Sequence, residues 1–152
     1  MKIMNQKSFD LRMQELKFQY VKELNEIERQ KDAIKRKKIE QLNSAETVFY
    51  NYKRVAMNEI NDITARRAMM DKDDTQREQL SAEISRLKSI IDARRSELTV
   101  EQNNIIENAY NQELELNYKH RKLRERSESE RLSAMRQLAA SREEVSNEKD
   151  NV

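Results

Sequence analysis

Residues that could take part in catalysis or metal binding are few in this chain, and their spacing suits neither role. The 152-residue sequence has a single histidine, His120, and no cysteine or glycine. The usual zinc patterns need clustered Cys or a second His, and a phosphate-binding loop needs glycine. Di-iron sites in helical bundles use Glu-x-x-His, but the residue three before His120 is Asn117. We therefore expect no catalytic, cofactor-binding or metal site, and a protein that is not an enzyme.

Two groups of side chains are instead candidates for contacts with a partner protein. Arg121, Lys122 and Arg124 belong to a basic run, and Tyr50 is expected to point away from the apolar side of its helix. Tyr and Arg are enriched among the residues that dominate protein interfaces. His120 lies inside the basic run and is expected to be a solvated surface residue. Acidic neighbours interrupt the basic runs and the net charge is only +2, so nucleic acid is not expected as the main partner.

The elements that carry these residues must be helices. The chain contains neither glycine, which supplies positive φ cheaply in turns, nor proline, which stops helices. Charged residues make up 38% of the sequence and apolar residues 36%, which suits a coiled coil because its apolar seam takes only about two residues in seven. Disorder is the alternative for so polar a chain, but the low net charge and the regular apolar spacing argue against it. The predicted fold class is all-α, a long coiled coil.

Apolar residues recur at spacings of three and four, which is the pattern of the a and d positions of a heptad. In the first half, one ladder contains Met13, Tyr20, Ile27, Ile34, Val48, Val55 and Met69, and the interleaved ladder contains Phe9, Leu16, Ala45 and Tyr52. In the second half, the pattern runs through Leu80, Ile84, Leu87, Ile91, Arg94, Leu98, Ile105, Ala109, Leu116 and Leu123. These residues are the expected seam between helices.

The segment between the two ladders has the features of a helix end followed by a new start. Thr75 and Glu78 have the spacing of a capping box, and Asp71, Asp73 and Asp74 suit the positive end of a helix. We therefore predict an antiparallel two-helix hairpin. The alternative is one uninterrupted helix, because nothing in this segment forbids helix.

The predicted hairpin has its apex near residues 71–75 and arms at about 5–70 and 75–140. Together they form a single coiled-coil rod over 1–140, and the tail 141–152 is expected to fray because it has almost no apolar seam. Folding at this apex places the basic run opposite Glu23 and Glu26.

A chain of this length without glycine or proline, with an apex near its middle, resembles in shape the hairpin stalks of flagellar and type III secretion export machines, the FliJ/YscO-like group. The resemblance implies a stalk that inserts into the pore of a hexameric ATPase and contacts the export gate. It further implies that Phe9–Leu24 and Leu123–Leu138 form the ATPase-facing end. The expected function is thus that of a non-enzymatic structural or interaction protein, a stalk or assembly subunit whose partners are other protein subunits.

Two other functions stay open on the sequence: a structural or scaffold protein of a phage virion, and a cytoplasmic helical chaperone or adaptor. A virion protein would self-associate, so a homo-oligomer is one of the expected states. No apolar run approaches the ~20 residues of a membrane span, and the N-terminus lacks the apolar region of a signal peptide. The expected location is the cytoplasm, or a virion or secretion assembly built there.

Overall fold

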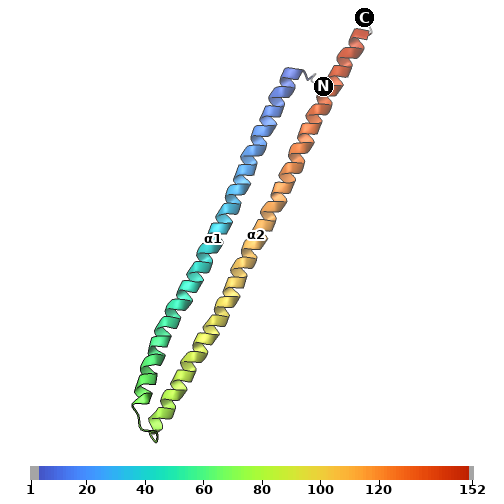
Figure 1. Cartoon of the computed structure of the whole chain (residues 1–152). Coiled ribbons are helices and arrows are strands. Elements are labelled where there is room, and N and C mark those ends of the chain that lie inside the picture. Colours follow the sequence, from blue (N-terminus) through green and yellow to red (C-terminus); the bar gives the residue numbers. More distant parts are fainter. Residues whose placement is uncertain (1–3, 151–152) are drawn as a thin grey trace. The chain divides into compact units, whose positions relative to one another are not determined.

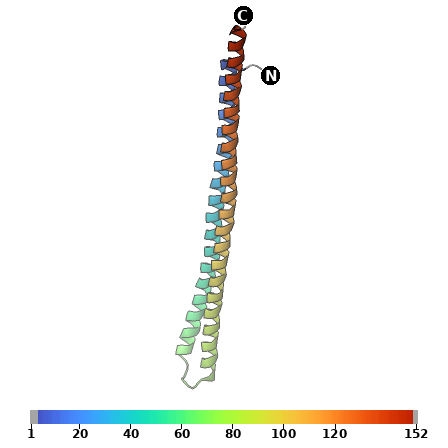
Figure 2. The same cartoon turned by 90° about the vertical axis from the view of Figure 1, so that its right-hand side faces the viewer.

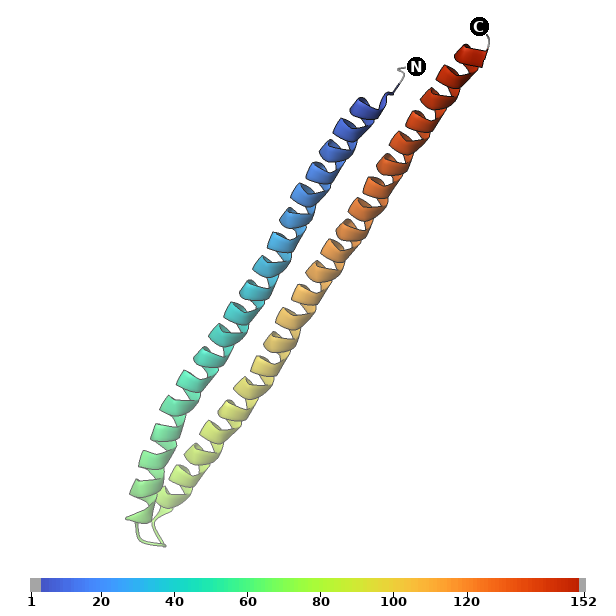
Figure 3. The ribbon, with the colours of Figure 1, turned by 45° about the horizontal axis from the view of Figure 1, so that its top comes forward.

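The computed structural model describes residues 4–150, and these residues form two long helices (Figure 1). Helix α1 spans Gln6–Ala68 and helix α2 spans Thr75–Asp150, with no strand in the described part of the chain. The helices pack against each other in opposite directions, as Figure 3 shows, and make a helical hairpin. The all-α hairpin prediction is therefore confirmed, and the uninterrupted helix is wrong.

Asn5 begins α1 by capping its free backbone donors. The Asn5 side-chain Oδ1 accepts a hydrogen bond of 2.8 Å from the backbone N–H of Ser8, and its carbonyl accepts one of 2.9 Å from Phe9. An Asn at this position satisfies donors that the first turn of a helix would otherwise leave unpaired.

The reversal between the helices takes the six residues Met69–Asp74 (Figure 2). It needs no left-handed backbone. Short backbone hydrogen bonds of 3.2 Å (Met69 N–H to Arg66 O) and 3.1 Å (Met70 N–H to Arg67 O) tighten the end of α1. No residue of the described chain has positive φ, so the turn forms without glycine. The apex lies where the sequence predicts it.

The start of α2 differs by one residue from the predicted capping box at Thr75 and Glu78. Asp74 is the cap, because its Oδ1 accepts a hydrogen bond of 2.9 Å from the backbone N–H of Gln76. Thr75 is then the first residue of α2. Arg67 also reaches from the end of α1 to the Ser81 hydroxyl of α2 at 3.2 Å, which ties the two helix ends together.

The hairpin divides into two compact units, each a pair of antiparallel helix segments. Unit 2 contains Lys35–Tyr110 and has a continuous apolar core. Both helices contribute side chains to this core, and Ile63 of α1 is the most buried, at 2% exposed. The other core residues are Phe49, Ala56 and Ile60 of α1 and Ile84, Leu87 and Ile91 of α2. Because these residues occupy one side of each helix, the core is a narrow seam between the two helices.

Unit 1 contains residues 4–34 and 111–150 of the described chain. Its core cluster consists of Ile27, Leu116 and Leu123, with Tyr20, Leu24 and Ile34 packed on it. Leu16, Ala134 and Leu138 are also buried in this unit. Unit 1 therefore buries five large aliphatic side chains, as many as unit 2, whose core also contains Phe49.

The predicted seam is confirmed in most of α2 and partly wrong in α1. Ile84, Leu87 and Ile91 are buried as expected. In α1, Val48 and Val55 were assigned to the seam but are 66% and 62% exposed, and the next residues, Phe49 and Ala56, are buried instead. Met69, also assigned to the seam, is 90% exposed and follows the end of α1. The true seam of α1 drifts by one residue because an almost straight helix has 3.6 rather than 3.5 residues per turn.

Helix α2 continues past the predicted boundary at residue 140 and ends at Asp150. Ser141 is buried at 6% exposure, and its hydroxyl accepts a hydrogen bond of 2.9 Å from the backbone N–H of Met4. Arg142 donates to the Gln6 side chain at 2.5 Å. Cross-helix polar contacts thus replace the missing apolar seam at the start of the predicted tail, whose last two residues, 151–152, lie outside the described residues.

One ion pair on the surface of α2 gives a prediction about pH. Arg86 donates two hydrogen bonds to Glu83, of 3.0 and 2.5 Å, and this contact holds the pKa of Glu83 below its ordinary value of 4.5. A carboxylate with a lowered folded-state pKa stabilises the fold above its ordinary pKa, and this contribution is lost as pH falls through the lowered value. Arg86→Gln is expected to raise the pKa of Glu83 back toward its ordinary value in a carboxyl NMR titration. Lys88→Gln, which leaves the pair intact, is the control, and an unchanged Glu83 pKa in Arg86→Gln would refute the assignment.

Candidate interaction surface

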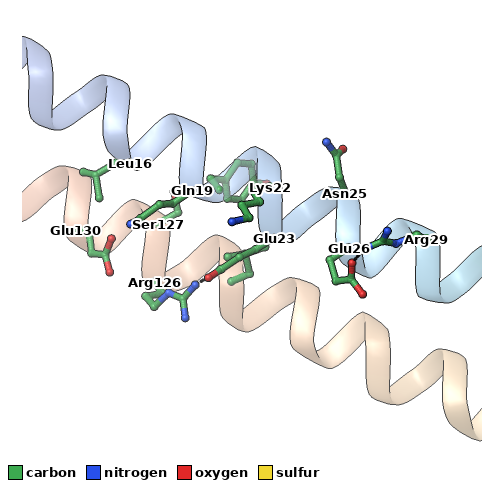
Figure 4. A pocket seen from close by; sticks show the side chains of 12 residues that line it. Leu16, Gln19, Lys22, Glu23, Asn25, Glu26, Arg29, Arg126, Ser127 and Glu130 are labelled. Atoms are coloured by element: carbon green, nitrogen blue, oxygen red, sulfur yellow. Dashed lines mark hydrogen bonds and ion pairs between the residues drawn. The ribbon is translucent and has the colours of Figure 1, made fainter.

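A groove in unit 1 has a volume of about 830 Å³ (Figure 4). Its walls come from residues 16–29 of α1 and 123–130 of α2. The floor is apolar, with Leu16 and Leu123 from the seam, and the rim is polar and charged. The groove is open to solvent along its length, as expected where two helices meet without a third element over them.

Four of the six charged residues that line this groove form ion pairs with one another. Arg126 of α2 forms an ion pair with Glu23 of α1, and Arg29 forms one with Glu26 along α1. Figure 4 shows Glu23 and Arg126 pointing toward each other across the groove. Arg126, the last residue of the basic run 119–126, therefore contacts Glu23 as expected, whereas Glu26 pairs with Arg29 of its own helix. Exposed ion pairs of this kind contribute about 0–1 kcal/mol, so they set the register of the helices more than they stabilise them.

A second groove in unit 1 has a volume of about 370 Å³ and a more apolar lining. Met13, Leu16 and Tyr20 form its apolar part, and Lys17 and Arg131 lie at its edge. The groups that line the two grooves are carboxylates, amides, cations, a phenol and the Ser127 hydroxyl, besides apolar side chains. The arrangement can hold polar or apolar side chains of another protein.

An aromatic side chain that the sequence analysis did not single out lies beside the predicted basic residues. Tyr118 is 52% exposed, and its ring centroid is 5.4 Å from the Arg121 guanidinium carbon and 5.5 Å from the Lys122 ammonium nitrogen. Cations three and four residues after an aromatic residue share its side of a helix. That spacing was visible in the sequence and is the signal that could have identified Tyr118.

The predicted partner-binding residues lie in two different units. Arg121 and Lys122 come together at Tyr118 in unit 1, and Arg124 is exposed one turn further along α2. Tyr50 belongs to unit 2, where it is 59% exposed and stacks edge-on against Phe49, with ring centroids 5.5 Å apart. The exposure of Tyr50 agrees with the sequence analysis, while its role as a contact residue stays a prediction.

The position of His120 differs from the expectation of a solvated surface residue. It is half-buried, because it lies four residues after Leu116 and three before Leu123, which puts it on the seam side of α2. The basic residues around it in sequence point to other sides of the helix. His120 therefore occupies a position on the seam side of α2 where the heptad spacing would lead one to expect an apolar residue.

The described residues contain no candidate metal site and no candidate membrane-spanning helix. No group of three or more His, Asp and Glu side chains in residues 4–148 could hold a metal ion. Neither helix, over its described length, has a segment both long and apolar enough to cross a membrane. Comparison of the chain with protein-family models, with curated proteins and with solved structures finds no match.

Proposed function

We propose that this chain is a non-enzymatic coiled-coil interaction protein that acts as a stalk or assembly subunit of a larger protein complex. The proposal is supported first by the way the two helices use their apolar residues. The seam that joins α1 to α2 is one side chain deep, so the helix pair has little interior in which a substrate pocket could be enclosed. Activity of such a molecule must lie on its outer surface.

The observation that carries the proposal is a second apolar stripe on the exposed surface of α1 in unit 1. Leu11 and Phe18 are seven residues apart there and are 54% and 71% exposed. In unit 2, a separate pair with the same spacing, Val48 and Val55, is 66% and 62% exposed. Single exposed apolar residues are ordinary, but repetition at seven residues is the pattern on which another helix packs. We infer that a helix of a partner subunit covers the stripe of unit 1.

The stripe predicts the outcome of a double substitution. Leu11→Ser with Phe18→Ser is expected to leave the helix content unchanged, because both side chains are exposed, and to reduce the partner complex at least about tenfold. Lys7→Ser with Gln14→Ser, at the same spacing on exposed polar positions, is the matched control. Native mass spectrometry of complexes purified from the source cells measures the change. Equal recovery of the complex with both double variants would contradict the proposal.

Within this class of function, we propose an export stalk, on the strength of the resemblance in shape to the FliJ/YscO-like group. The two segments that this resemblance assigns to the ATPase, Phe9–Leu24 and Leu123–Leu138, both lie in unit 1 and supply residues of its groove of about 830 Å³. The same mass spectrometry separates the proposal from its rivals by stoichiometry. One copy of the chain per ATPase ring supports a stalk, a closed homo-oligomer supports a virion protein, and recovery with unfolded clients supports a chaperone.

A further inference from the structure

One side of α2 in unit 1 combines apolar, aromatic and basic side chains that face away from α1. Leu114, Tyr118, Arg121 and Lys122 form this surface, which we call the Tyr118 face. Leu114 and Tyr118 are 46% and 52% exposed, whereas Leu116, two residues from each, is 6% exposed. Two residues correspond to about 200° around a helix, so the face lies on the side opposite the seam.

The two cations of the face are held at the Tyr118 ring and stay in contact with solvent. The Arg121 guanidinium carbon is 5.4 Å and the Lys122 nitrogen 5.5 Å from the ring centroid. Lys122 also lies 3.6 Å from the carboxylate of Glu125, and the two side chains are 55% and 58% exposed. Cation–π contacts and ion pairs at exposed sites contribute about 1 kcal/mol or less each. A carboxylate from a partner can therefore replace the Glu125 contact at little cost.

We propose that the Tyr118 face binds an acidic amphipathic helix of a partner protein. Apolar residues of that helix would pack on Leu114 and Tyr118, and its carboxylates would contact Arg121 and Lys122. The proposal rests on the proposed function and adds the chemistry of one partner segment. Charge complementarity argues for it, because an aromatic ring flanked by two cations attracts an apolar surface bordered by negative charge.

Glu125 distinguishes a protein partner from a nucleic acid. Its carboxylate lies among the cations of the face and is 58% exposed, and Glu128 follows one turn later on the exposed surface of α2. A nucleic acid backbone carries a negative charge at every phosphate, so it cannot follow this face without meeting these carboxylates. A peptide helix can instead place single carboxylates only where the cations are.

The probe for this proposal is a labelled peptide of about 21 residues that repeats Leu-Glu-Ala-Ala-Leu-Glu-Glu, long enough to form a helix on its own. Fluorescence anisotropy measures its binding to the full chain. Tyr118→Ala and the double variant Arg121→Glu with Lys122→Glu are each expected to weaken binding about tenfold or more. Ile39→Ala, which removes an apolar side chain of α1 that is 55% exposed, is the control and is expected to bind like the parent. Circular dichroism checks that every variant keeps its helix content.

Three results would overturn the proposal. These are no binding of the acidic peptide to the parent up to about 1 mM, unchanged binding by the Tyr118 and charge-reversal variants, and equal or tighter binding of the same peptide with Lys in place of Glu. Tighter binding of a single-stranded DNA of similar length through these same residues would assign the face to nucleic acid. Loss of the assembly-subunit proposal would appear instead as a chain recovered from cells without partners, so the two failures can be told apart.

Discussion

Ile63→Asp is expected to destabilise the hairpin by about 3 kcal/mol or more, the largest effect of any single substitution considered. Ile63 is 2% exposed in the core of unit 2, and its replacement puts a carboxylate with no partner among apolar side chains. An unpaired buried charge costs several kcal/mol. Urea unfolding followed by circular dichroism measures the loss.

Val55→Asp is the matched control for Ile63→Asp, because it introduces the same group into α1 eight residues earlier. Val55 is 62% exposed, so this variant is expected to change stability by less than about 0.5 kcal/mol. The two variants also test the structure against the heptad pattern, because the pattern places Val55 in the seam and the structure places it on the surface. A larger loss in Val55→Asp than in Ile63→Asp would show that the seam of unit 2 is wrongly placed.

Leu116→Ala in unit 1 is expected to cost about 2–5 kcal/mol, the usual range for emptying a buried leucine site. Leu116 is 6% exposed and packs in the core cluster with Ile27 and Leu123. Leu114→Ala, two residues away at 46% exposure, removes the same atoms from the surface and is expected to cost less than about 0.5 kcal/mol. Thermal and urea unfolding of the two variants side by side give the comparison. Similar losses from both would mean that this part of α2 has no defined seam side.

The sequence predicts the helices and their reversal well because both depend on local chemistry. The absence of glycine and proline leaves helix as the main option, and the acidic segment around Asp73 interrupts it near the middle. Seam positions are predicted best where a single apolar residue occupies the seam side, as at Ile84 and Leu87. Where two adjacent residues are both apolar, as at Val48 and Phe49, the heptad rule cannot choose between them, and a drift of one residue decides which is buried.

Contacts between the two helices are harder to predict from the sequence than contacts within one helix. Arg94 is predicted to lie in the seam but is exposed, and its guanidinium carbon lies 3.9 Å from the centroid of the Tyr52 ring on the other helix. That contact depends on the register between α1 and α2, which the sequence fixes only to within a few residues. Tyr118 is the opposite case, because its partners Arg121 and Lys122 follow it on the same helix. The spacing of these three residues was enough to predict this contact. The heptad pattern did not reveal it, because Tyr118 lies outside the seam.

The antiparallel pairing of α1 with α2 is the claim on which the rest depends, and cross-linking tests it most directly. The chain has no cysteine, so thiols introduced by Glu23→Cys and Arg126→Cys are unique. The parent side chains at these positions form an ion pair, and a short bis-maleimide is expected to join the two thiols within one chain, at monomer mass. The control combines Glu23→Cys with Arg142→Cys, sixteen residues or about 24 Å further along α2, and should not cross-link. A dimer-mass product, or equal yields from both pairs, would contradict the hairpin.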